Sequence, residues 1–314
     1  MADDQFLPKL PVIDFSMENL KSGTSSWFSK CNNVKSAFEE YGCFVAVYDK
    51  VSLELHNSMI GTLEGLFDLP KDTKIRNTYD KPYFGYVREE PSKIVPESMG
   101  IDDATTLEGT QYFSNLMWPS GNHHFSETVL SYSRHVSELE QMVKRMVFQS
   151  YGVEKYYDSH MESTNYLLRL IKYIEPETNE KKLGCQIHTD KSFITILHQN
   201  EVNGLEIGTK DGQWIRFGPS PSSFVVIAGD ALLAWSNGRI HSPNHRVVMQ
   251  GTKARYSIGL FSFHRGTIQI PEELVDDKHP LQFKPFDHFG LTNYFYYGYE
   301  SGKTDLAVEA YCGV

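Results

Sequence analysis

The segment His188-Thr-Asp-Lys-Ser-Phe-Ile-Thr-Ile-Leu197 combines two potential metal ligands with an apolar run that favours a β-strand. A second histidine, His245, begins a further apolar run, His245-Arg-Val-Val248, far along the chain. Side chains two positions apart on a strand point to the same face, so we expect His188 and Asp190 to point the same way. Two imidazoles and one carboxylate leave half of an iron(II) coordination sphere open. The sequence therefore predicts an iron centre held by His188, Asp190 and His245.

Two other residues compete for the ligand positions. His241 precedes Ser242-Pro243 rather than opening a strand, so it is a weaker candidate than His245. Cys185 lies shortly before His188, and we expect a small buried apolar side chain there rather than a fourth ligand. A structural zinc site would be closed by a fourth protein ligand, whereas three ligands on one face leave room for other molecules.

Arg255 and Ser257 lie in the apolar run 255–263 and are expected on one strand face. An unpaired arginine facing a core would be costly. Arginine and a hydroxyl can together hold a carboxylate, and each charge-assisted bond contributes roughly 1.5–3 kcal/mol when shielded from water. A surface salt bridge for Arg255 and a solvated Ser257 are the alternative, but the apolar neighbours favour a site for an organic acid.

The second half of the chain consists of short apolar runs separated by turns. Turn signals occur at Gly229-Asp230, Asn237-Gly238 and Gln250-Gly251. We expect strands over 166–173, 193–198, 204–207, 213–217, 223–228, 245–249 and 255–263. Strands at this spacing are typical of a sandwich or jelly roll.

The first half of the chain is mainly helical. Periodic apolar residues predict helices over 25–41, 52–68 and 126–151, with short strands at 10–14 and 43–48. Residues 70–125 have no clear period and are typical of binding loops. Residues 291–314 predict a C-terminal helix with an aromatic lead-in.

Composition limits the classes of function. The chain has 314 residues, of which 40% are hydrophobic and 22% charged, as in ordinary globular proteins. Its net charge of −10 argues against nucleic acid as a partner. No apolar run approaches the ~18 residues of a membrane span, and the start, Met1-Ala-Asp-Asp-Gln5, lacks the features of a signal peptide. The cysteines at 31, 43, 185 and 312 are scattered, which favours a reducing, cytoplasmic setting. We also expect a monomer that binds a small-molecule substrate.

Further motifs occur along almost the whole chain. They include Leu10-Pro-Val-Ile-Asp-Phe15, Tyr41-Gly-Cys-Phe44, Leu66-Phe-Asp-Leu-Pro70, Glu97-Ser-Met-Gly-Ile-Asp102, Trp235-Ser-Asn-Gly-Arg239, Ala254-Arg-Tyr-Ser257 and Tyr311-Cys-Gly-Val314. With the His188-Thr-Asp190 segment and His245-Arg246, they resemble the plant iron(II)/2-oxoglutarate-dependent dioxygenase superfamily. Within it, the chain is most similar to the AOP-like branch, named for alkenyl- and hydroxyalkyl-producing enzymes of glucosinolate metabolism.

The resemblance implies a fold and a domain organisation. The fold is mainly β with flanking helices, around a double-stranded β-helix core of the jelly-roll or cupin-like type. A helical N-terminal region, 1–165, would carry substrate-pocket loops. Residues 166–290 would form the β-core, and 291–314 a C-terminal helix or lid.

The resemblance also implies residue roles and cofactors. His188, Asp190 and His245 would bind Fe(II), and Arg255 with Ser257 would hold the distal carboxylate of 2-oxoglutarate. Tyr173 stands where the family usually has a tyrosine that reaches the same carboxylate. The chain departs from the family nearby, because Ile171-Lys172 replaces the usual Asn-Tyr. The co-substrates would be 2-oxoglutarate and O2, with ascorbate supporting activity.

The expected reaction is the oxidation of a small specialised metabolite with release of succinate and CO2. A carboxylate at Asp190 points to hydroxylation, desaturation or dealkylation, because related halogenases carry a small residue there. Candidates for the substrate wall are Phe84, Tyr86, Phe113 and Phe263, with Tyr83 and the aromatics of 294–297 as further candidates. Packing between the helices and the β-core is an equally good role for each of them. The substrate stays open among thio compounds, alkaloids, hormones such as auxin, and phenolics.

Two other functions fit the same motifs. An ascorbate-dependent non-haem iron oxidase of the same fold would also carry Arg255 and Ser257, and substrate-dependent succinate release would distinguish it. A non-catalytic jelly-roll binding protein is the alternative from another class, since fold does not fix function. Absence of iron binding would favour it.

Overall fold

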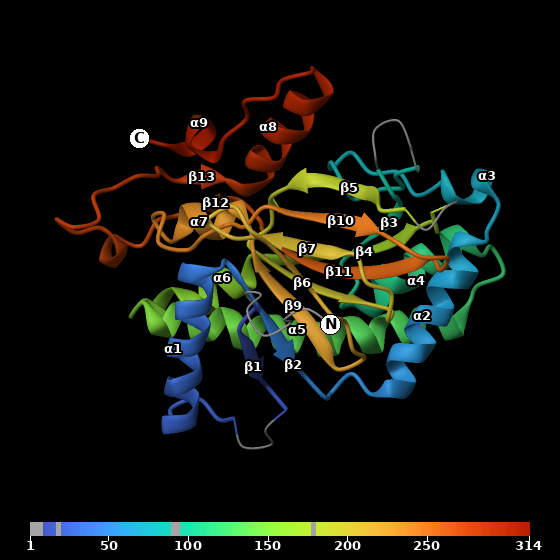
Figure 1. Ribbon diagram of the computed structural model, residues 1–314, viewed down its shortest axis with the longest axis horizontal. Helices are drawn as coiled ribbons and strands as arrows, with labels where there is room; N and C mark the ends of the chain where they lie inside the picture. Colours follow the sequence, from blue (N-terminus) through green and yellow to red (C-terminus); the bar gives the residue numbers. More distant parts are fainter. Residues whose placement is uncertain (1–8, 17–19, 89–94, 177–179) are drawn as a thin grey trace.

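Two β-sheets that face each other form the centre of the protein, as the computed structural model shows (Figure 1). The structure describes residues 9–16, 20–88, 95–176 and 180–314. The prediction that Met1–Gln5 is not part of a signal peptide therefore falls outside the described residues. Within these ranges, the larger sheet has the order β1-β2-β9-β6-β11-β4-β3 and the smaller sheet β5-β10-β7-β8. This arrangement is the mainly β, jelly-roll core predicted from the sequence.

The larger sheet takes strands from both halves of the chain. They are β1 (Val12–Asp14), β2 (Cys43–Val47), β3 (Glu97–Asp102), β4 (Thr164–Tyr173), β6 (Ile194–Gln199), β9 (Ser223–Ala228) and β11 (Arg255–His264). β1 and β2 are parallel, and the other neighbours are antiparallel. Because β1, β2 and β3 come from the N-terminal region, that region and the β-core share one sheet.

Alternate residues of the central strands face opposite layers. Leu168 and Leu170 of β4, with Ile258 of β11, pack into the core that includes the helices. The intervening positions of β11, among them Arg255 and Ser257, therefore face the smaller sheet. In the β4–β11 pair, Arg255 lies opposite Tyr173 and His264 opposite Thr164.

The smaller sheet supplies the strands at the site. They are β5 (Lys182–His188), β10 (His245–Met249), β7 (Leu205–Gly208) and β8 (Trp214–Arg216). β5 is absent from the strands predicted by apolar runs, because its sequence Lys-Leu-Gly-Cys-Gln-Ile-His is largely polar. As an edge strand with partly exposed side chains, it has no continuous apolar signature.

Helices cover the outer face of the larger sheet (Figure 1). They are α1 (Ser25–Glu40), α2 (Leu53–Phe67), α4 (Leu107–Met117), α5 (His123–Ser150) and α6 (Tyr157–Glu162), while the short α3 (Lys71–Lys74) lies beside α4. α5 begins earlier than predicted, because Asn122 rather than Ser126 accepts the hydrogen bond of the first turn, from the backbone N–H of Phe125 at 3.0 Å. Ser126 is instead buried inside that turn.

The described residues of the region 70–125 contain more regular structure than the sequence predicts. They include α3, β3 and α4. β3 has no visible period, because Met99 and Ile101 pack in the core while Ser98 is also buried and Gly100 stands between them. A strand that is buried on both faces and contains polar residues and glycine has no alternating apolar pattern, so it was not predicted.

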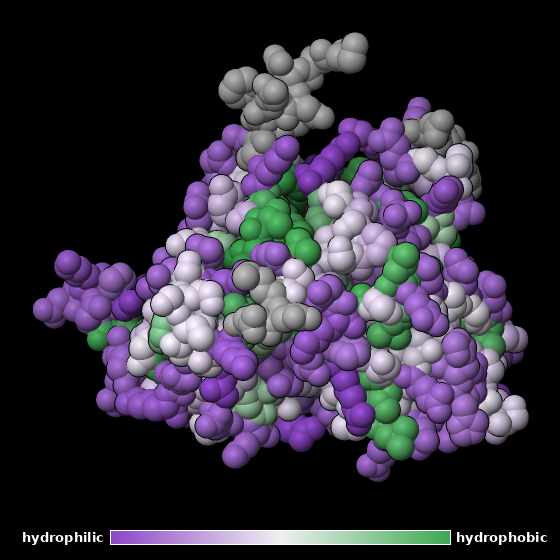
Figure 2. Space-filling model, turned by 90° about the horizontal axis from the view of Figure 1, so that it is seen from below, coloured by the Kyte–Doolittle hydropathy of each residue, from purple (hydrophilic) through white to green (hydrophobic). Residues whose placement is uncertain are grey.

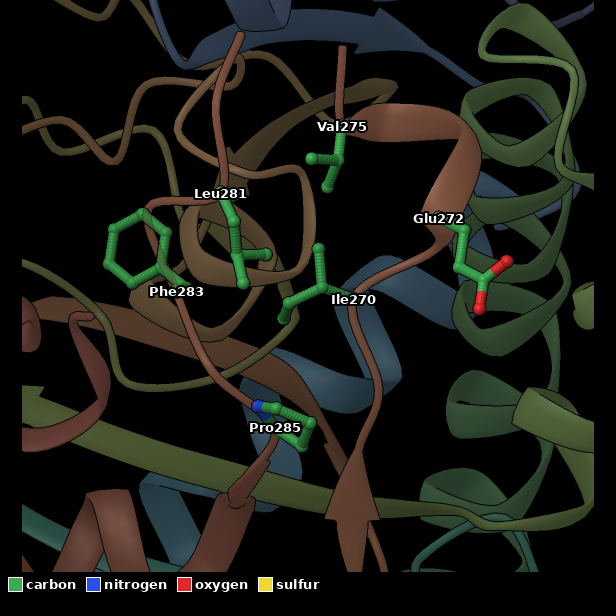
Figure 3. A pocket seen from close by; sticks show the side chains of 6 residues that line it. All are labelled: Ile270, Glu272, Val275, Leu281, Phe283 and Pro285. Atoms are coloured by element: carbon green, nitrogen blue, oxygen red, sulfur yellow. The ribbon is translucent and has the colours of Figure 1, made fainter.

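The C-terminal part contains α7 (Asp230–Trp235), β12 (Thr267–Ile268), β13 (Phe286–Asp287), α8 (His288–Glu300) and α9 (Val308–Cys312). The aromatic residues 294–297 lie inside α8 rather than leading into a helix. A shallow apolar depression nearby is lined by Ile270, Glu272, Val275, Leu281, Phe283 and Pro285, none of which is a predicted site residue (Figure 3).

Hydrophilic side chains cover most of the side at the bottom of Figure 1, and apolar ones form separate patches there (Figure 2). Among the described residues, no helix combines the length and apolar character needed to cross a bilayer.

Candidate metal centre and anion site

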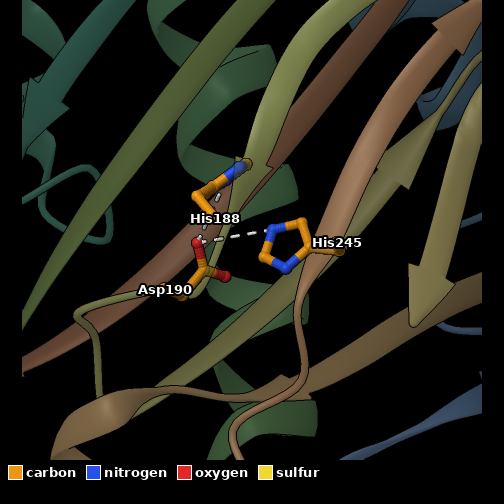
Figure 4. A group of neighbouring side chains, drawn as sticks. All are labelled: His188, Asp190 and His245. Atoms are coloured by element: carbon orange, nitrogen blue, oxygen red, sulfur yellow. Dashed lines mark ion pairs between the residues drawn. The ribbon is translucent and has the colours of Figure 1, made fainter. Parts of the chain in front are cut away.

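His188, Asp190 and His245 converge at one end of the smaller sheet (Figure 4). Nε2 of His188 lies 3.9 Å from Oδ1 of Asp190, and Nε2 of His245 lies 3.7 Å from the same oxygen. These distances are too long for hydrogen bonds. They leave room for a cation between the three atoms, since metal–ligand distances are about 2.0–2.2 Å.

His188 and Asp190 do not lie on one strand, contrary to the prediction from the sequence. β5 ends at His188, so Asp190 lies in the following loop rather than on the same strand. The two histidines instead sit opposite each other, because the β5–β10 pairing places His245 against His188. The strand pair aligns the imidazoles, and the loop brings the carboxylate to them.

Backbone carbonyls orient both imidazoles. Nδ1 of His188 lies 2.8 Å from the carbonyl oxygen of Gln186, and Nδ1 of His245 lies 3.2 Å from that of Pro243. A carbonyl only accepts, so each Nδ1 carries the proton and each Nε2 keeps a lone pair. Such partners are the usual second contact of metal-binding histidines.

The two imidazoles differ in exposure and basicity. The side chain of His188 is 39% exposed and that of His245 is 5% exposed, so the centre opens on the His188 side. Burial lowers the pKa of His245 to about 4, and the neighbouring His188 acts in the same direction. Burial also opposes charge on His188, but Cys185, Asp190 and the Gln186 carbonyl raise its pKa above the usual value. The pKa values of the two imidazoles are thus shifted in opposite directions, and metal binding would require both Nε2 atoms to be free of protons.

Asp230 fixes the loop that carries Asp190. Its backbone N–H donates to the carbonyl of Asp190 at 2.7 Å, and its carboxylate accepts from Thr189 at 3.0 Å and from Ser242 at 2.7 Å. The carboxylate also pairs with the Lys191 ammonium. The sequence predicted only a turn at Gly229-Asp230, whereas α7 begins at Asp230. An aspartate placed after a glycine at the end of the apolar run 223–228 was the signal available in the sequence.

Gly229 allows the loop that carries Asp190 to lie close to the start of α7. A Cβ at this position would lie 1.9 Å from the carbonyl oxygen of Ser192, which is far inside contact distance. The residue is therefore required for close approach between the loop and the start of α7.

Arg255 and Ser257, the residues predicted to hold an organic acid, are both buried on β11. Arg255 is 1% exposed and Ser257 is 2% exposed. One guanidinium nitrogen donates to Gln199 Oε1 at 2.7 Å, and the Tyr173 ring lies 4.8 Å from the guanidinium carbon. Tyr173 packs with Val247, two positions after His245 on β10. One buried cluster thus connects the arginine to the metal-ligand strand.

Orphaned polar atoms test whether a metal and an acid fit these residues. Oδ2 of Asp190 and two nitrogens of Arg255, Nε and Nη1, are buried without hydrogen-bond partners. Burial lowers the pKa of Arg255 and so disfavours its charge, while Tyr173 acts against this. Unpaired buried groups of opposite charge are costly unless ligands complete them. A divalent cation at Asp190 and a carboxylate at Arg255 would satisfy both.

The aromatic residues predicted to line the substrate pocket lie in different parts of the structure. Phe84 and Phe263 are buried in one cluster with ring centroids 5.6 Å apart. Tyr83 contacts Tyr296 of α8 edge-on at 5.3 Å. Phe113 instead stacks on Phe125 between α4 and α5, inside the helical core, so it is not retained as a substrate contact.

The remaining candidates have other partners. Tyr86 donates to Glu97 at 2.8 Å. His241 is not part of the ligand cluster. The Cys185 sulfur lies 3.9 Å from Nδ1 of His188, on the side away from the ligand nitrogen, and the residue is only partly buried.

The chain is similar to known oxygenases over nearly its whole length. A family profile described as the 2OG-Fe(II) oxygenase superfamily matches residues 153–264, and one described as the N-terminal part of non-haem dioxygenases in morphine synthesis matches 10–120. The probable 2-oxoglutarate-dependent dioxygenase AOP1.2 of Arabidopsis thaliana is 48% identical over 306 residues, which cover 93% of this chain and 94% of that relative.

Solved structures show the same similarity. The rice dioxygenase for auxin oxidation has a TM-score of 0.80 and 29% identity, covering 98% of this chain and 100% of its own. The Arabidopsis thaliana dioxygenase for auxin oxidation, in complex with 2-oxoglutarate, has a TM-score of 0.76 and 29% identity, covering 86% and 99%.

Proposed function

The chain belongs to the AOP-like branch of the iron(II)- and 2-oxoglutarate-dependent oxygenases, and on this premise we propose that His188, Asp190 and His245 bind its iron. We also propose that Arg255 and Ser257 hold the distal carboxylate of 2-oxoglutarate, with Tyr173 packed beside it. The observation that supports both roles most directly is the set of buried, unpartnered atoms on Asp190 and Arg255.

The chain's own residues position and shield the reactants. When bound, iron(II) with 2-oxoglutarate and O2 supplies the oxidising chemistry, with succinate and CO2 as co-products. The two carbonyls at Nδ1 aim the imidazole Nε2 atoms, and Asp230 holds the Asp190 loop. Arg255 fixes the far end of 2-oxoglutarate in a buried site, which sets its orientation relative to the metal ligands.

The substrate proposed is a small specialised metabolite, oxidised by hydroxylation, desaturation or dealkylation. The relatives that act in auxin oxidation support a compound of this size. Phe84 and Phe263 are the aromatic residues retained for its apolar wall. We propose a cytoplasmic location, which the four free cysteines support. We also propose that the protein is a monomer. Gel filtration with light scattering would test the monomer.

Turnover with a plant metabolite extract tests the function as a whole. The wild-type protein, given iron(II), ascorbate and 2-oxoglutarate, should form succinate and shift the mass of an extract compound. His188→Ala should do neither, because a ligand is lost, while His241→Ala is the matched control and should keep both. Succinate formation by His188→Ala at the wild-type level would refute the assignment.

Arg255→Ala tests the co-substrate site. Loss of two charge-assisted bonds, each worth roughly 1.5–3 kcal/mol, should raise the concentration of 2-oxoglutarate needed for half-maximal succinate formation by at least about 100-fold. Iron content measured by atomic absorption should stay the same, since Arg255 is not a ligand. An unchanged 2-oxoglutarate requirement would remove Arg255 from this role. Oxidation of the substrate by the wild type without succinate release would instead favour an oxidase that does not use 2-oxoglutarate.

A further inference from the structure

A second buried arginine lies on the same inner face of the larger sheet as the anion site. Arg169 of β4 is 9% exposed and shares its strand face with Tyr173. Its guanidinium donates to the Ser98 hydroxyl and to the backbone carbonyl of Tyr83. Both partners are neutral. In the described ranges of the chain, no carboxylate forms an ion pair with Arg169.

Burying a cation without a paired anion costs free energy and is unusual in proteins. Burial lowers the pKa of Arg169 to about 10, so the group still carries its charge at neutral pH. Two neutral acceptors do not offset the loss of hydration of a full charge. Arg255 has the same problem, and there an acid co-substrate solves it.

The two arginines resemble each other in their surroundings. Arg255 has Ser257 beside it, and Arg169 has the buried Ser98. A serine hydroxyl can both accept from the arginine and donate to an oxyanion. Arginine and serine therefore occur together twice in one interior, at two separate places along the β4–β11 pair.

Their separation lets both sites be filled together. The ladder places Arg255 opposite Tyr173 and Gly259 opposite Arg169, which are four residue pairs apart. At about 3.3 Å per residue this is roughly 13 Å, longer than one small dicarboxylate can bridge while also binding a metal. Arg169 thus faces the same interior as Arg255 but lies outside the 2-oxoglutarate site.

The neighbours of Arg169 form an apolar wall. Its two cross-strand partners are glycines, Gly100 on β3 and Gly259 on β11. The Phe261 ring lies against Gly259. Leu167, two positions before Arg169, packs with Phe84 and Phe263. A charged group at one end and aromatic rings beside it suit an acid with an apolar body.

We propose that Arg169 and Ser98 bind an oxyanionic group of the substrate to be oxidised, most simply a carboxylate, while its apolar body lies against the Phe84–Phe263 cluster. This inference rests on the proposed function and names its substrate class. The same chemistry could come from a carboxylic acid or from a sulfate ester.

The first test changes the anion. A plant metabolite extract is divided into three parts: one untreated, one methylated at carboxyl groups and one treated with sulfatase. The wild-type protein should oxidise a compound of the untreated extract, and methylation should abolish that mass shift. Loss after sulfatase alone would support the oxyanion and assign it to a sulfate ester. Oxidation of the same compound in all three parts would overturn the proposal.

The second test changes the arginine. Arg169→Gln should raise the apparent KM for the compound found above by about 10- to 100-fold, and Arg169→Lys should recover part of this loss. Lys172→Gln is the matched control, because Lys172 lies on the opposite face of β4, 3.9 Å from Asp68. It should behave like the wild type.

Binding measurements separate this inference from the proposed function. By calorimetry, anaerobic Arg169→Gln loaded with iron(II) should bind 2-oxoglutarate as the wild type does. If the wild type itself binds no iron or 2-oxoglutarate, the proposed function fails. If both bind but Arg169→Gln keeps the wild-type KM, or loses kcat alone with a lower melting temperature, Arg169 is only a structural tie between β3, β4 and Tyr83.

Discussion

Among the histidine clusters in the described part of the chain, two have similar ring spacing but different surroundings. The first is His188 and His245, with ring centroids 4.2 Å apart. The second joins His160 to His264, with centroids 4.7 Å apart, and includes His288. The spacing of the rings is almost the same, so proximity of imidazoles does not define a metal centre.

The neighbouring charge distinguishes the clusters. Asp190 stands between His188 and His245 with one buried oxygen unpartnered. The second cluster lies near Lys144, which pairs with Glu140 at 3.0 Å on α5. Burial lowers the pKa of His160 well below its usual value, and Lys144 adds to that effect. Asp190 therefore favours a cation at the first cluster, whereas the Lys144 ammonium opposes one at the second.

The use of the ring nitrogens distinguishes them further. His288 accepts from the backbone N–H of His264 at Nδ1, at 2.9 Å, and its Nε2 lies 2.8 Å from the carbonyl of Lys191. Both nitrogens are therefore used by the backbone. In the first cluster only Nδ1 is used, and Nε2 stays available. His288 ties α8 to the residue after Asp190, so it supports the centre without being a ligand.

Removal of the carboxylate should have the largest effect on this contrast. Asp190→Ala should abolish iron binding and succinate formation, because two imidazoles alone offer neither the charge nor the third ligand. His264→Ala, in the second cluster, is the matched variant and should retain stoichiometric iron, measured by atomic absorption. Loss of iron in both variants would show that the second cluster also contributes to metal binding.

The residues of the centre could be predicted from the sequence because their chemistry is explicit. His188, Asp190 and His245 form a recognisable ligand set, and apolar runs identified most strands of the β-core. The reason given for the His188–Asp190 pair was wrong in detail, since Asp190 lies beyond the end of β5. Metal geometry constrains where three side chains meet, not which backbone conformation brings them there.

The supporting residues could not be predicted, because their roles depend on tertiary contacts. Asp230 acts through four partners that are distant or inconspicuous in the sequence. Arg169 resembled any other residue of an apolar strand until its burial and its neutral partners were known. β5 and β3 were missed because polar or glycine residues interrupt their apolar pattern.

The loop that carries Asp190 offers the next largest effect. Gly229→Ala would place a Cβ 1.9 Å from the Ser192 carbonyl and force the loop away from α7. Iron affinity should fall about 10- to 100-fold, as for other changes behind metal ligands. Gly218→Ala is the control, since its Cβ would meet nothing within 4 Å. Equal iron affinities in the two variants, measured by competition with a chelator, would contradict the role given to Gly229.

The smallest effect expected is on the pH dependence of stability. Burial lowers the pKa of His288 to about 3, with His264 and Lys144 adding to the shift. The folded state thus keeps His288 neutral while the unfolded chain takes up a proton below about pH 6.5. The free energy of unfolding should therefore fall as the pH drops from 6.5, by about 1 kcal/mol at pH 5.5 from this residue.

His288→Gln should remove that part of the acid sensitivity, because glutamine can still donate and accept but does not titrate. Urea unfolding at pH 7.5 and 5.5 would measure the difference, with the exposed His124 replaced by Gln as the control. His198, whose pKa burial also lowers to about 3, should leave the remaining acid sensitivity in place. If His288→Gln loses as much stability on acidification as the wild type, burial does not hold His288 neutral in the folded state. The contrast between the two histidine clusters then rests on the neighbouring charge alone.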